Sequence, residues 1–268
     1  MKTKTPFFRR FGIEFEFSTP MKEAKKLIRN IFARVYKAKG HNLISNNISY
    51  SCDASYKKWE LKYDGSTEIE LTTPISKLRN FNKINQILAL LYNNLCNNRL
   101  KLTNNDSAHL HMQANDVPKH NIIAAWIQIE KTILKCFPEH RRDNNYCQKL
   151  IHWKRYKKIS DFFIDAEIES NAHHAILSLN YYGSRKTVEF RIMEGNVDSH
   201  DIQPWVKFCM LFLNYAKKVD PIEIICNEAQ PKLTIDEMIT LLNIKDKEVI
   251  GFLKRREAHF KKITHKQL

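Results

Sequence analysis

The chain has 268 residues, 43% of them hydrophobic and 11% aromatic, which is enough to bury a substantial core within a single domain over 1–268. No apolar run reaches the roughly 18 residues of a membrane span, and the N-terminus lacks the apolar core of a signal peptide, so we expect a cytoplasmic protein with no membrane contact. The formal net charge of +15 predicts an anionic partner, namely a nucleotide, a nucleic acid or an acidic peptide. The six cysteines are widely spaced and form no C-x-x-C pair, which favours packed thiols over disulfides or a zinc site.

The sequence predicts strands and helices that alternate along the chain, without low-complexity linkers or internal repeats. Four of the strands alternate polar and apolar residues, which predicts an antiparallel or mixed sheet with one solvated, functional face and helices on the other, an α+β fold. The segment 139–165 is basic, aromatic and irregular, and the C-terminal part at about 199–268 is helical. We expect strands at 11–17, 48–52, 58–63, 68–73, 109–114, 175–180 and 187–193, and helices at 19–40, 78–96, 117–136, 199–217, 234–242 and 246–260.

The first strand places two carboxylates on one face. Glu14 and Glu16 are two residues apart, so they share a face opposite the apolar residues beside them. Like charges at this spacing repel each other unless a cation lies between them, which makes a metal site plausible. Glu189 and Arg191 share a face of the strand at 187–193 in the same way. Solvent-exposed strands also alternate like this, so Glu14 and Glu16 alone would favour a plain wet surface.

Two histidines, His109 and His111, share a face of the strand at 109–114. One imidazole can bind a divalent metal while the other donates to a phosphate. Glu70, on the strand at 68–73, adds a further metal-compatible carboxylate. The alternative for each is an ordinary strand residue, satisfied in the core or half-exposed at the surface.

The six glycines of the chain form no glycine-rich phosphate-binding loop. If the protein binds a nucleotide, its phosphates must therefore be held by metals, arginine and histidine rather than by a cradle of backbone N–H groups.

Four motifs follow one another along the chain as G-x-E-x-E, E-[IL]-x-[ST]-P, H-x-H and E-F-R, beginning at Gly12, Glu70, His109 and Glu189. In this order they resemble the glutamine-synthetase-like carboxylate-amine ligases, and the closest match is similar to the putative amidoligase family of that superfamily. The resemblance runs from Phe11 to about Leu213 and includes a turn at 64–66. It implies a curved, mainly antiparallel sheet of the glutamine-synthetase catalytic type, with helices packed on one face.

The resemblance also implies a role for each motif residue. Glu14 and Glu16 would coordinate two or three divalent cations, Mg²⁺ or Mn²⁺, that bridge ATP and the acceptor carboxylate. Glu70 would be the next metal ligand, although the short distance from the turn at 64–66 leaves Glu68 open as an alternative. The remaining implied roles are metal ligands for His109 and Glu189, a phosphate contact for His111, neutralisation of the γ-phosphoryl group for Arg191, and a phosphate or substrate contact for Arg142.

Such an enzyme would form an amide or isopeptide bond in an ATP-dependent reaction. Phosphoryl transfer to a carboxylate gives an acyl phosphate, whose charge is screened by metals and a guanidinium, and an amine then displaces phosphate. The implied partners are an acid (an amino acid, a peptide or a protein side chain) and an amine, and no residue stands out as the base. The chain is short for this class, so a cover over the acceptor site could come from a partner subunit in an oligomer.

Two other functions stay open. Glu60-Leu61-Lys62, with Asp53 upstream, resembles the E-x-K core of metal-dependent nucleases, and the positive charge would suit DNA. This interpretation leaves the four motifs without a role, so nucleic acid is not the favoured partner. A catalytically silent ligase fold that binds a nucleotide or another protein would keep every metal ligand, and only the detection of a product separates it from an enzyme.

Overall fold

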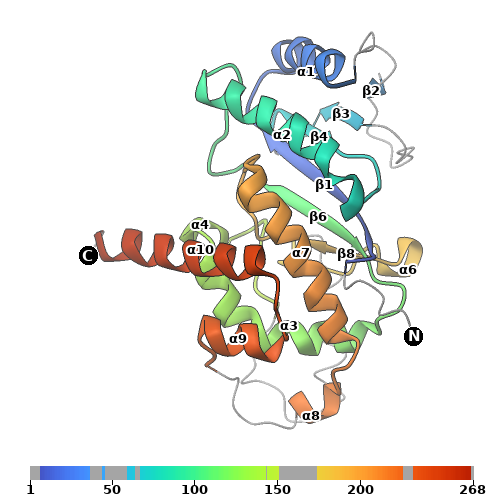
Figure 1. Cartoon of the computed structure of the whole chain (residues 1–268), viewed down its shortest axis with the longest axis vertical. Coiled ribbons are helices and arrows are strands. Elements are labelled where there is room, and N and C mark those ends of the chain that lie inside the picture. The colour runs from blue at the N-terminus through green and yellow to red at the C-terminus, as the bar shows by residue number, and fades with distance from the viewer. Residues whose placement is uncertain are drawn as a thin grey trace. The chain divides into compact units, whose positions relative to one another are not determined.

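Helices and an eight-stranded sheet make up the computed structural model (Figure 1), which describes residues 7–36, 44–45, 59–63, 67–142, 144–150, 174–225 and 232–266. None of the described helices has both the length and the apolar composition that a membrane span requires. The strands are β1 (Arg10–Phe17), β2 (Ile44–Ser45), β3 (Trp59–Tyr63), β4 (Ile69–Thr72), β5 (Ser76–Lys77), β6 (Ala108–Gln113), β7 (Leu177–Ser178) and β8 (Thr187–Phe190). The helices are α1 (Met21–Tyr36), α2 (Phe81–Cys96), α3 (Lys119–Ile133), α4 (Glu139–Arg142), α6 (Tyr182–Arg185), α7 (Ser199–Ala216), α8 (Pro221–Ile225), α9 (Ile235–Leu241) and α10 (Lys247–Lys266), and 3-10 helices lie at Leu78–Asn80 and Leu134–Cys136.

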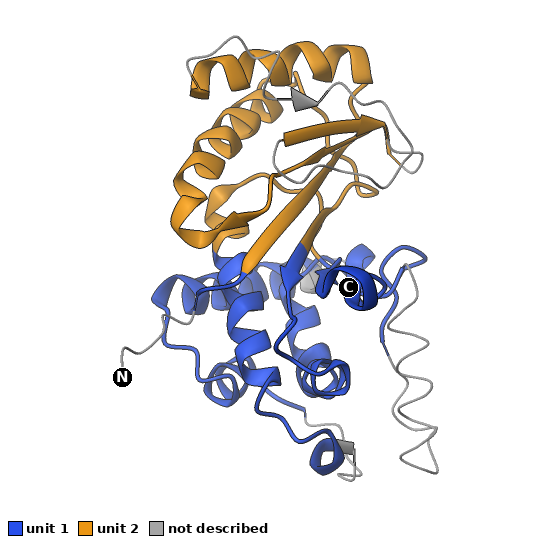
Figure 2. Ribbon diagram, turned by 90° about the vertical axis from the view of Figure 1, so that its right-hand side faces the viewer, with its two compact units in different colours: residues 1–9, 111–192, 204–268 blue, residues 10–110, 193–203 orange. Residues whose placement is uncertain are grey.

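The chain divides into two compact units, which Figure 2 colours separately. Unit 1 comprises Met1–Arg9, His111–Ile192 and Pro204–Leu268, and unit 2 comprises Arg10–Leu110 and Met193–Gln203. Strand β6 and helix α7 each begin in unit 2 and end in unit 1. At these two places the chain passes from one unit to the other within regular secondary structure.

Unit 2 is built on the strand order β2-β3-β4-β1-β6, with β5 paired to β1. The pairs β1–β4, β1–β5 and β3–β4 are antiparallel, and β2–β3 is parallel. The Phe11 ring of β1 lies 5.9 Å from the Phe81 ring of α2, and the Phe32 ring of α1 lies 5.2 Å from the Trp59 ring of β3. Full burial of such a side chain contributes about 1.5–3 kcal/mol. Because α1 and α2 cover the apolar face of these strands, the alternating polar residues project from the other face.

Unit 1 contains the end of β6, followed in the sheet by β8 and β7, and β7 and β8 are antiparallel. An aromatic cluster surrounds Phe190 of β8, whose ring lies 5.9 Å from the rings of Trp126 in α3 and Phe212 in α7. All three side chains are fully buried. Since Phe190 points into this cluster, Glu189 projects from the opposite face of β8.

Most of the predicted elements, and the prediction of helices with a mainly antiparallel sheet, are confirmed; the glutamine-synthetase type of sheet stays a prediction. The last two strands are shorter than predicted, because β7 contains only Leu177–Ser178 and β8 ends at Phe190. The carbonyl that follows β8, that of Arg191, accepts a hydrogen bond from the Arg141 side chain rather than from a neighbouring strand. The predicted strand at 48–52 and the turn at 64–66 lie outside the described residues. The shortest elements, namely β2, β5, α4, α6 and α8, were not predicted, because periodicity does not show over so few residues.

Of the described cysteines, Cys136, Cys147 and Cys209 are buried and Cys96 is exposed. Burial raises the pKa of Cys136 to about 12 and raises the pKa of Cys209 above its usual value. Because the thiolate is the reactive form, these two buried thiols are packing groups rather than nucleophiles.

Gly195 lies against the segment that leads into β6. Its N–H donates to the Asp106 carbonyl at 2.8 Å, and a Cβ at this position would lie 2.9 Å from the Asp106 Cβ and 3.2 Å from its carbonyl carbon. Neither atom belongs to the far end of a flexible side chain, so any substituent at Gly195 must displace the Asp106 segment.

We expect Gly195→Ala to lower the free energy of unfolding by roughly 1–3 kcal/mol, because overpacking forces the backbone at Asp106 to shift. The matched control is Gly251→Ala in α10, where nothing lies within 4 Å of an added Cβ. The higher helix propensity of alanine should stabilise that variant by about 0.5–1 kcal/mol. Urea unfolding followed by circular dichroism measures both, and a Gly195→Ala protein as stable as wild type would contradict the close contact.

Candidate functional site

Strand register in unit 2 aligns polar residues of β1, β4 and β3 across the sheet. Directly opposite residues in antiparallel strands project from the same face. Two rows result, one made of Glu14, Thr72 and Glu60 and the other of Glu16, Glu70 and Lys62.

We call the four carboxylates of these rows, Glu14, Glu16, Glu60 and Glu70, the acidic face. Glu16 and Glu60 are each only 7% exposed, and Glu14 and Glu70 are half-buried. The acidic face is therefore much less exposed than the solvated face that polar alternation predicted. Carboxylates held close together with little water repel strongly, because the Coulomb energy rises as the effective dielectric constant falls. Such a face is stable only with cations or hydrogen-bond donors beside it.

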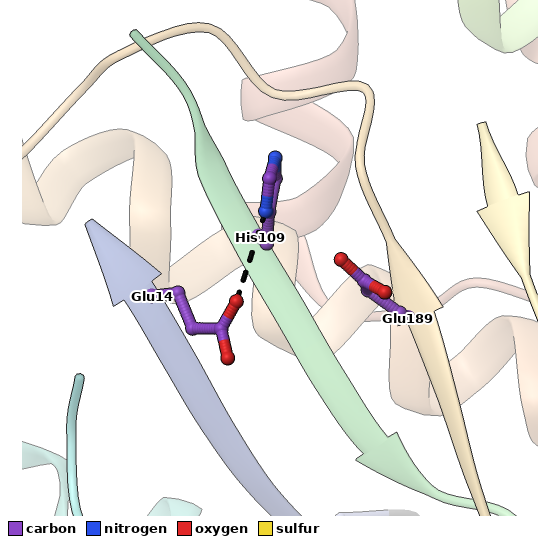
Figure 3. A group of neighbouring side chains, drawn as sticks. All are labelled: Glu14, His109 and Glu189. Atoms are coloured by element: carbon purple, nitrogen blue, oxygen red, sulfur yellow. Dashed lines mark ion pairs between the residues drawn. The ribbon is translucent and has the colours of Figure 1, made fainter. Parts of the chain in front are cut away.

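His109 of β6, which belongs to the same unit, faces two of these carboxylates. Figure 3 marks its approach to Glu14 and shows, on β8, the predicted ligand Glu189. The His109 Nδ1 lies 3.7 Å from Glu14 Oε2 and 3.8 Å from Glu16 Oε1, and both separations exceed the upper limit of about 3.2 Å for a direct hydrogen bond. Two ligands that are each about 2.1 Å from one metal are roughly 3.0–4.2 Å apart, depending on the angle between them. The spacing therefore fits that of ligands of a shared divalent ion.

Ser107, directly before β6, is a site residue that the sequence interpretation missed. Its hydroxyl donates to Glu16 Oε2 and lies 2.5 Å from His109 Nε2. The side chain is 2% exposed. The available signal was its position two residues before His109, which puts both side chains on one face of an extended chain.

Lys62 is a cation on the same face. Its Nζ lies 3.3 Å from Glu70 Oε1 and 4.0 Å from Glu60 Oε2. Burial by itself would lower the pKa of Lys62, but Glu70, Glu14 and Glu60 together raise it above its usual value. The E-x-K residues Glu60 and Lys62 thus share one face with the predicted metal ligands instead of forming a separate site.

Glu70 lies opposite Glu16, whereas Glu68 is exposed, so Glu70 is the one of the two alternatives that lies on the acidic face. Burial, followed by the charge of Glu14, raises the pKa of Glu70 to about 7. Lys62 and a 2.8 Å hydrogen bond from Thr72 Oγ1 act in the other direction, because both favour the charged carboxylate.

A second group of predicted site residues lies in unit 1. Arg191 Nη1 is 2.5 Å from Glu189 Oε1, and its Nε donates to the Tyr146 carbonyl at 3.4 Å. His111 Nε2 lies 4.0 Å from the same Glu189 oxygen. Glu189 and Arg191 are both buried. A guanidinium has five N–H donors and these contacts use two, so Arg191 can hold Glu189 and still bind an anion.

Arg142, predicted to contact phosphate or substrate, donates from Nε to the Phe137 carbonyl at 2.8 Å. The arginine that reaches the end of β8 is its neighbour Arg141, whose buried Nη2 donates to the Arg191 carbonyl at 2.5 Å. The ligand contact of Arg142 stays a prediction. Arg141 holds the backbone that presents the Arg191 guanidinium.

The raised pKa of Glu70 predicts that stability depends on pH. The ordinary pKa of this carboxyl is 4.5 and its folded value is about 7, so the folded state binds the proton more tightly. The stability that this group contributes is complete below pH 4.5 and is lost as the pH rises through 7. In metal-free protein we therefore expect Glu70→Gln to be more stable than wild type at about pH 8, by up to roughly 3 kcal/mol, and to have no advantage near pH 4.

Urea unfolding in EDTA at the two pH values measures this difference. Glu68→Gln, at an exposed position on the same segment, is the matched control and should follow wild type at both. An advantage of Glu70→Gln that does not change with pH would contradict the raised pKa.

Comparison with models of protein families matches residues 8–213 to the family described as putative amidoligase enzyme. The matched range extends from the residues before β1 into α7 and contains every predicted site residue. A comparison with curated proteins found no match.

Proposed function

Because the chain belongs to the family of putative amidoligase enzymes, we propose that it is an ATP-dependent carboxylate-amine ligase that forms an amide through an acyl phosphate. The acid would be an amino acid, a peptide or a protein side chain, and the second substrate an amine. The antiparallel strand pairs of unit 2, with α1 and α2 on their apolar side, support a sheet of the glutamine-synthetase type.

The observation that supports this function best is the acidic face together with His109. Burying a charge that lacks a partner costs several kcal/mol, so a fold does not keep four shielded carboxylates on adjacent strands for packing alone. The spacing of His109 Nδ1 from Glu14 and Glu16 is that of ligands of one ion. Divalent cations held there would screen the charges of a nucleotide's phosphates and of the carboxylate that attacks them.

The unit 1 group supplies the remaining contacts in this proposal. His109 and His111 are two residues apart in β6, and such residues lie about 6.5–7 Å apart in a strand. One triphosphate would therefore span both histidines. Arg191, whose Nη1 is fixed by Glu189, would neutralise the γ-phosphoryl group during its transfer.

The proposed chemistry has two steps. A carboxylate oxygen of the acid attacks the γ-phosphorus, the bond to the β,γ-bridging oxygen breaks, and ADP leaves with that electron pair. The amine then attacks the acyl carbon, the bond from carbon to the phosphate oxygen breaks, and phosphate leaves while the amine nitrogen loses a proton. Arg191 and His111 act on the first step, because the negative charge is concentrated on the phosphoryl oxygens at that point.

Hydroxylamine in place of the natural amine tests the reaction type. With ATP, Mg²⁺ and a panel of carboxylates, we expect the purified protein to form a hydroxamate and ADP without AMP, because the proposed contacts neutralise the γ-phosphate end of the nucleotide. Ferric chloride colorimetry and nucleotide chromatography measure the products. Glu16→Gln should slow the reaction about 10²–10³-fold, and Glu68→Gln should leave it unchanged.

Other products would change this assignment in defined ways. A hydroxamate accompanied by AMP and pyrophosphate would keep the ligase but overturn the acyl phosphate. Metal-dependent ATP binding by calorimetry, without a hydroxamate from any acid, would favour a ligase fold that binds a nucleotide without catalysis.

A metal-dependent nuclease is the second candidate, because Glu60 and Lys62 of the E-x-K motif lie on the acidic face. Asp53, the third residue of that motif, lies outside the described residues. The nuclease gives no role to His109, Glu189 or Arg191, so we expect purified protein not to nick supercoiled plasmid in Mg²⁺ or Mn²⁺. Nicking that copurifies with the protein and is abolished in Glu60→Gln would establish the nuclease instead.

A further inference from the structure

The Ser107 hydroxyl lies between an acidic-face carboxylate and the predicted histidine ligand. It donates to Glu16 Oε2 and lies 2.5 Å from His109 Nε2. Ser107, Glu16 and His109 are each less than 10% exposed, and all three belong to unit 2. Neither the family match nor the motifs assign a role to Ser107.

With Glu16 as a carboxylate, counting hydrogens assigns a direction to the two contacts. A hydroxyl carries one hydrogen, and that of Ser107 is directed to Glu16. A separation of 2.5 Å between Ser107 Oγ and His109 Nε2 requires a hydrogen between the two atoms, so this hydrogen belongs to Nε2. In a neutral imidazole with its hydrogen on Nε2, Nδ1 is a bare lone pair.

The bare nitrogen faces the acidic face. Nδ1 lies 3.7 Å from Glu14 Oε2 and 3.8 Å from Glu16 Oε1, and Glu16 meets Ser107 through its other oxygen, Oε2. We propose that Ser107 is a positioning residue that fixes His109 with its hydrogen on Nε2, so that Nδ1 and Glu16 Oε1 are both directed to a divalent metal. This inference rests on the metal site of the proposed ligase, and it adds the residue that orients two of its ligands.

The backbone holds Ser107 in place for this task. Its carbonyl accepts a hydrogen bond from the Glu16 N–H at 3.0 Å, and it forms a bridge with Glu194 on its other side. The preceding residue, Asp106, is fully buried and accepts hydrogen bonds from Ser18 Oγ at 2.9 Å and from the Thr103 N–H at 2.6 Å. A hydroxyl fixed in this way needs no reordering when a metal binds, which favours affinity.

A serine beside a histidine and a glutamate also resembles a nucleophilic triad, but three observations favour the positioning role. Ser107 is 2% exposed, so a substrate cannot reach its oxygen. Its hydrogen is directed to Glu16 rather than to the histidine that would have to remove it. The third group of such a triad, Glu14, lies 3.7 Å from Nδ1, which is too far to orient the ring by a hydrogen bond.

The experiment combines nuclear magnetic resonance with calorimetry on the full chain. Correlations between ring carbon-bound hydrogens and ring nitrogens in ¹⁵N-histidine-labelled, metal-free protein at about pH 8.5 distinguish the two tautomers, and His109→Gln identifies the His109 signals among the 11 histidines. We expect wild-type His109 to carry its hydrogen on Nε2 and Ser107→Ala to lose this preference. Titration with Mn²⁺ alone should show about 10–100-fold weaker binding by Ser107→Ala.

Ser76→Ala is the matched control. Ser76 of β5 is another buried serine of unit 2, but its hydroxyl donates to the Pro74 carbonyl at 3.0 Å, so its removal should change neither the tautomer nor Mn²⁺ affinity.

Each outcome decides one claim. Wild-type His109 with its hydrogen on Nδ1 would overturn the inference, and this measurement needs neither metal nor a folded Ser107→Ala protein. A folded Ser107→Ala protein with wild-type Mn²⁺ affinity would overturn it as well. If tautomer and affinity behave as expected but no hydroxamate forms, the ligase reaction fails and the role of Ser107 stands.

Discussion

Repulsion among buried carboxylates is the physical constraint on which the site depends. The acidic face has four carboxylates, and the described lysine that shares its rows is Lys62, which carries one ammonium group. Hydroxyl donors from Thr72 and Ser107 stabilise individual oxygens without adding charge. The pKa of Glu70 is raised because burial, followed by the Glu14 charge, outweighs Lys62. A divalent cation bound there, as in the proposed function, would remove this repulsion directly.

Apolar packing on the other side of the same strands is what holds these charges in place. The Phe11 ring of β1 packs on Phe81 of α2, and the Trp59 ring of β3 packs on Phe32 of α1. An element anchored through one face cannot rotate to bring its other face into water without exposing several aromatic side chains, each worth about 1.5–3 kcal/mol. The hydrophobic contacts therefore offset the electrostatic cost of holding the acidic-face carboxylates close together. Strands without such packing would separate to bring these carboxylates into water.

Local patterns in the sequence predicted the strands and which residues share a face, and the order of four motifs predicted the family. What they could not predict depends on contacts between distant segments. The register that sets Lys62 opposite Glu70 is fixed by pairing of β3 with β4, and the approach of Ser107 to Glu16 links residues 91 positions apart. Burial of the acidic face was missed for the same reason, since alternation shows that a face is polar but not what covers it. Arg141 and Arg142 are adjacent and chemically identical, so only the structure shows that Arg141 reaches the Arg191 carbonyl.

The missing glycine-rich loop gives strand β6 a particular importance. A nucleotide bound without such a loop depends on side chains for every phosphate contact, and those side chains must keep a fixed spacing. β6 meets this requirement through connectivity alone, because the first segment of unit 2 ends at Leu110 and unit 1 continues from His111 within one strand. His109 and His111 thus belong to different units, yet the extended backbone fixes their separation at about 6.5–7 Å, however the rest of each unit is arranged. A metal at His109 and a phosphate at His111 would keep the spacing that this strand sets, which makes the strand the natural reference point of the proposed reaction.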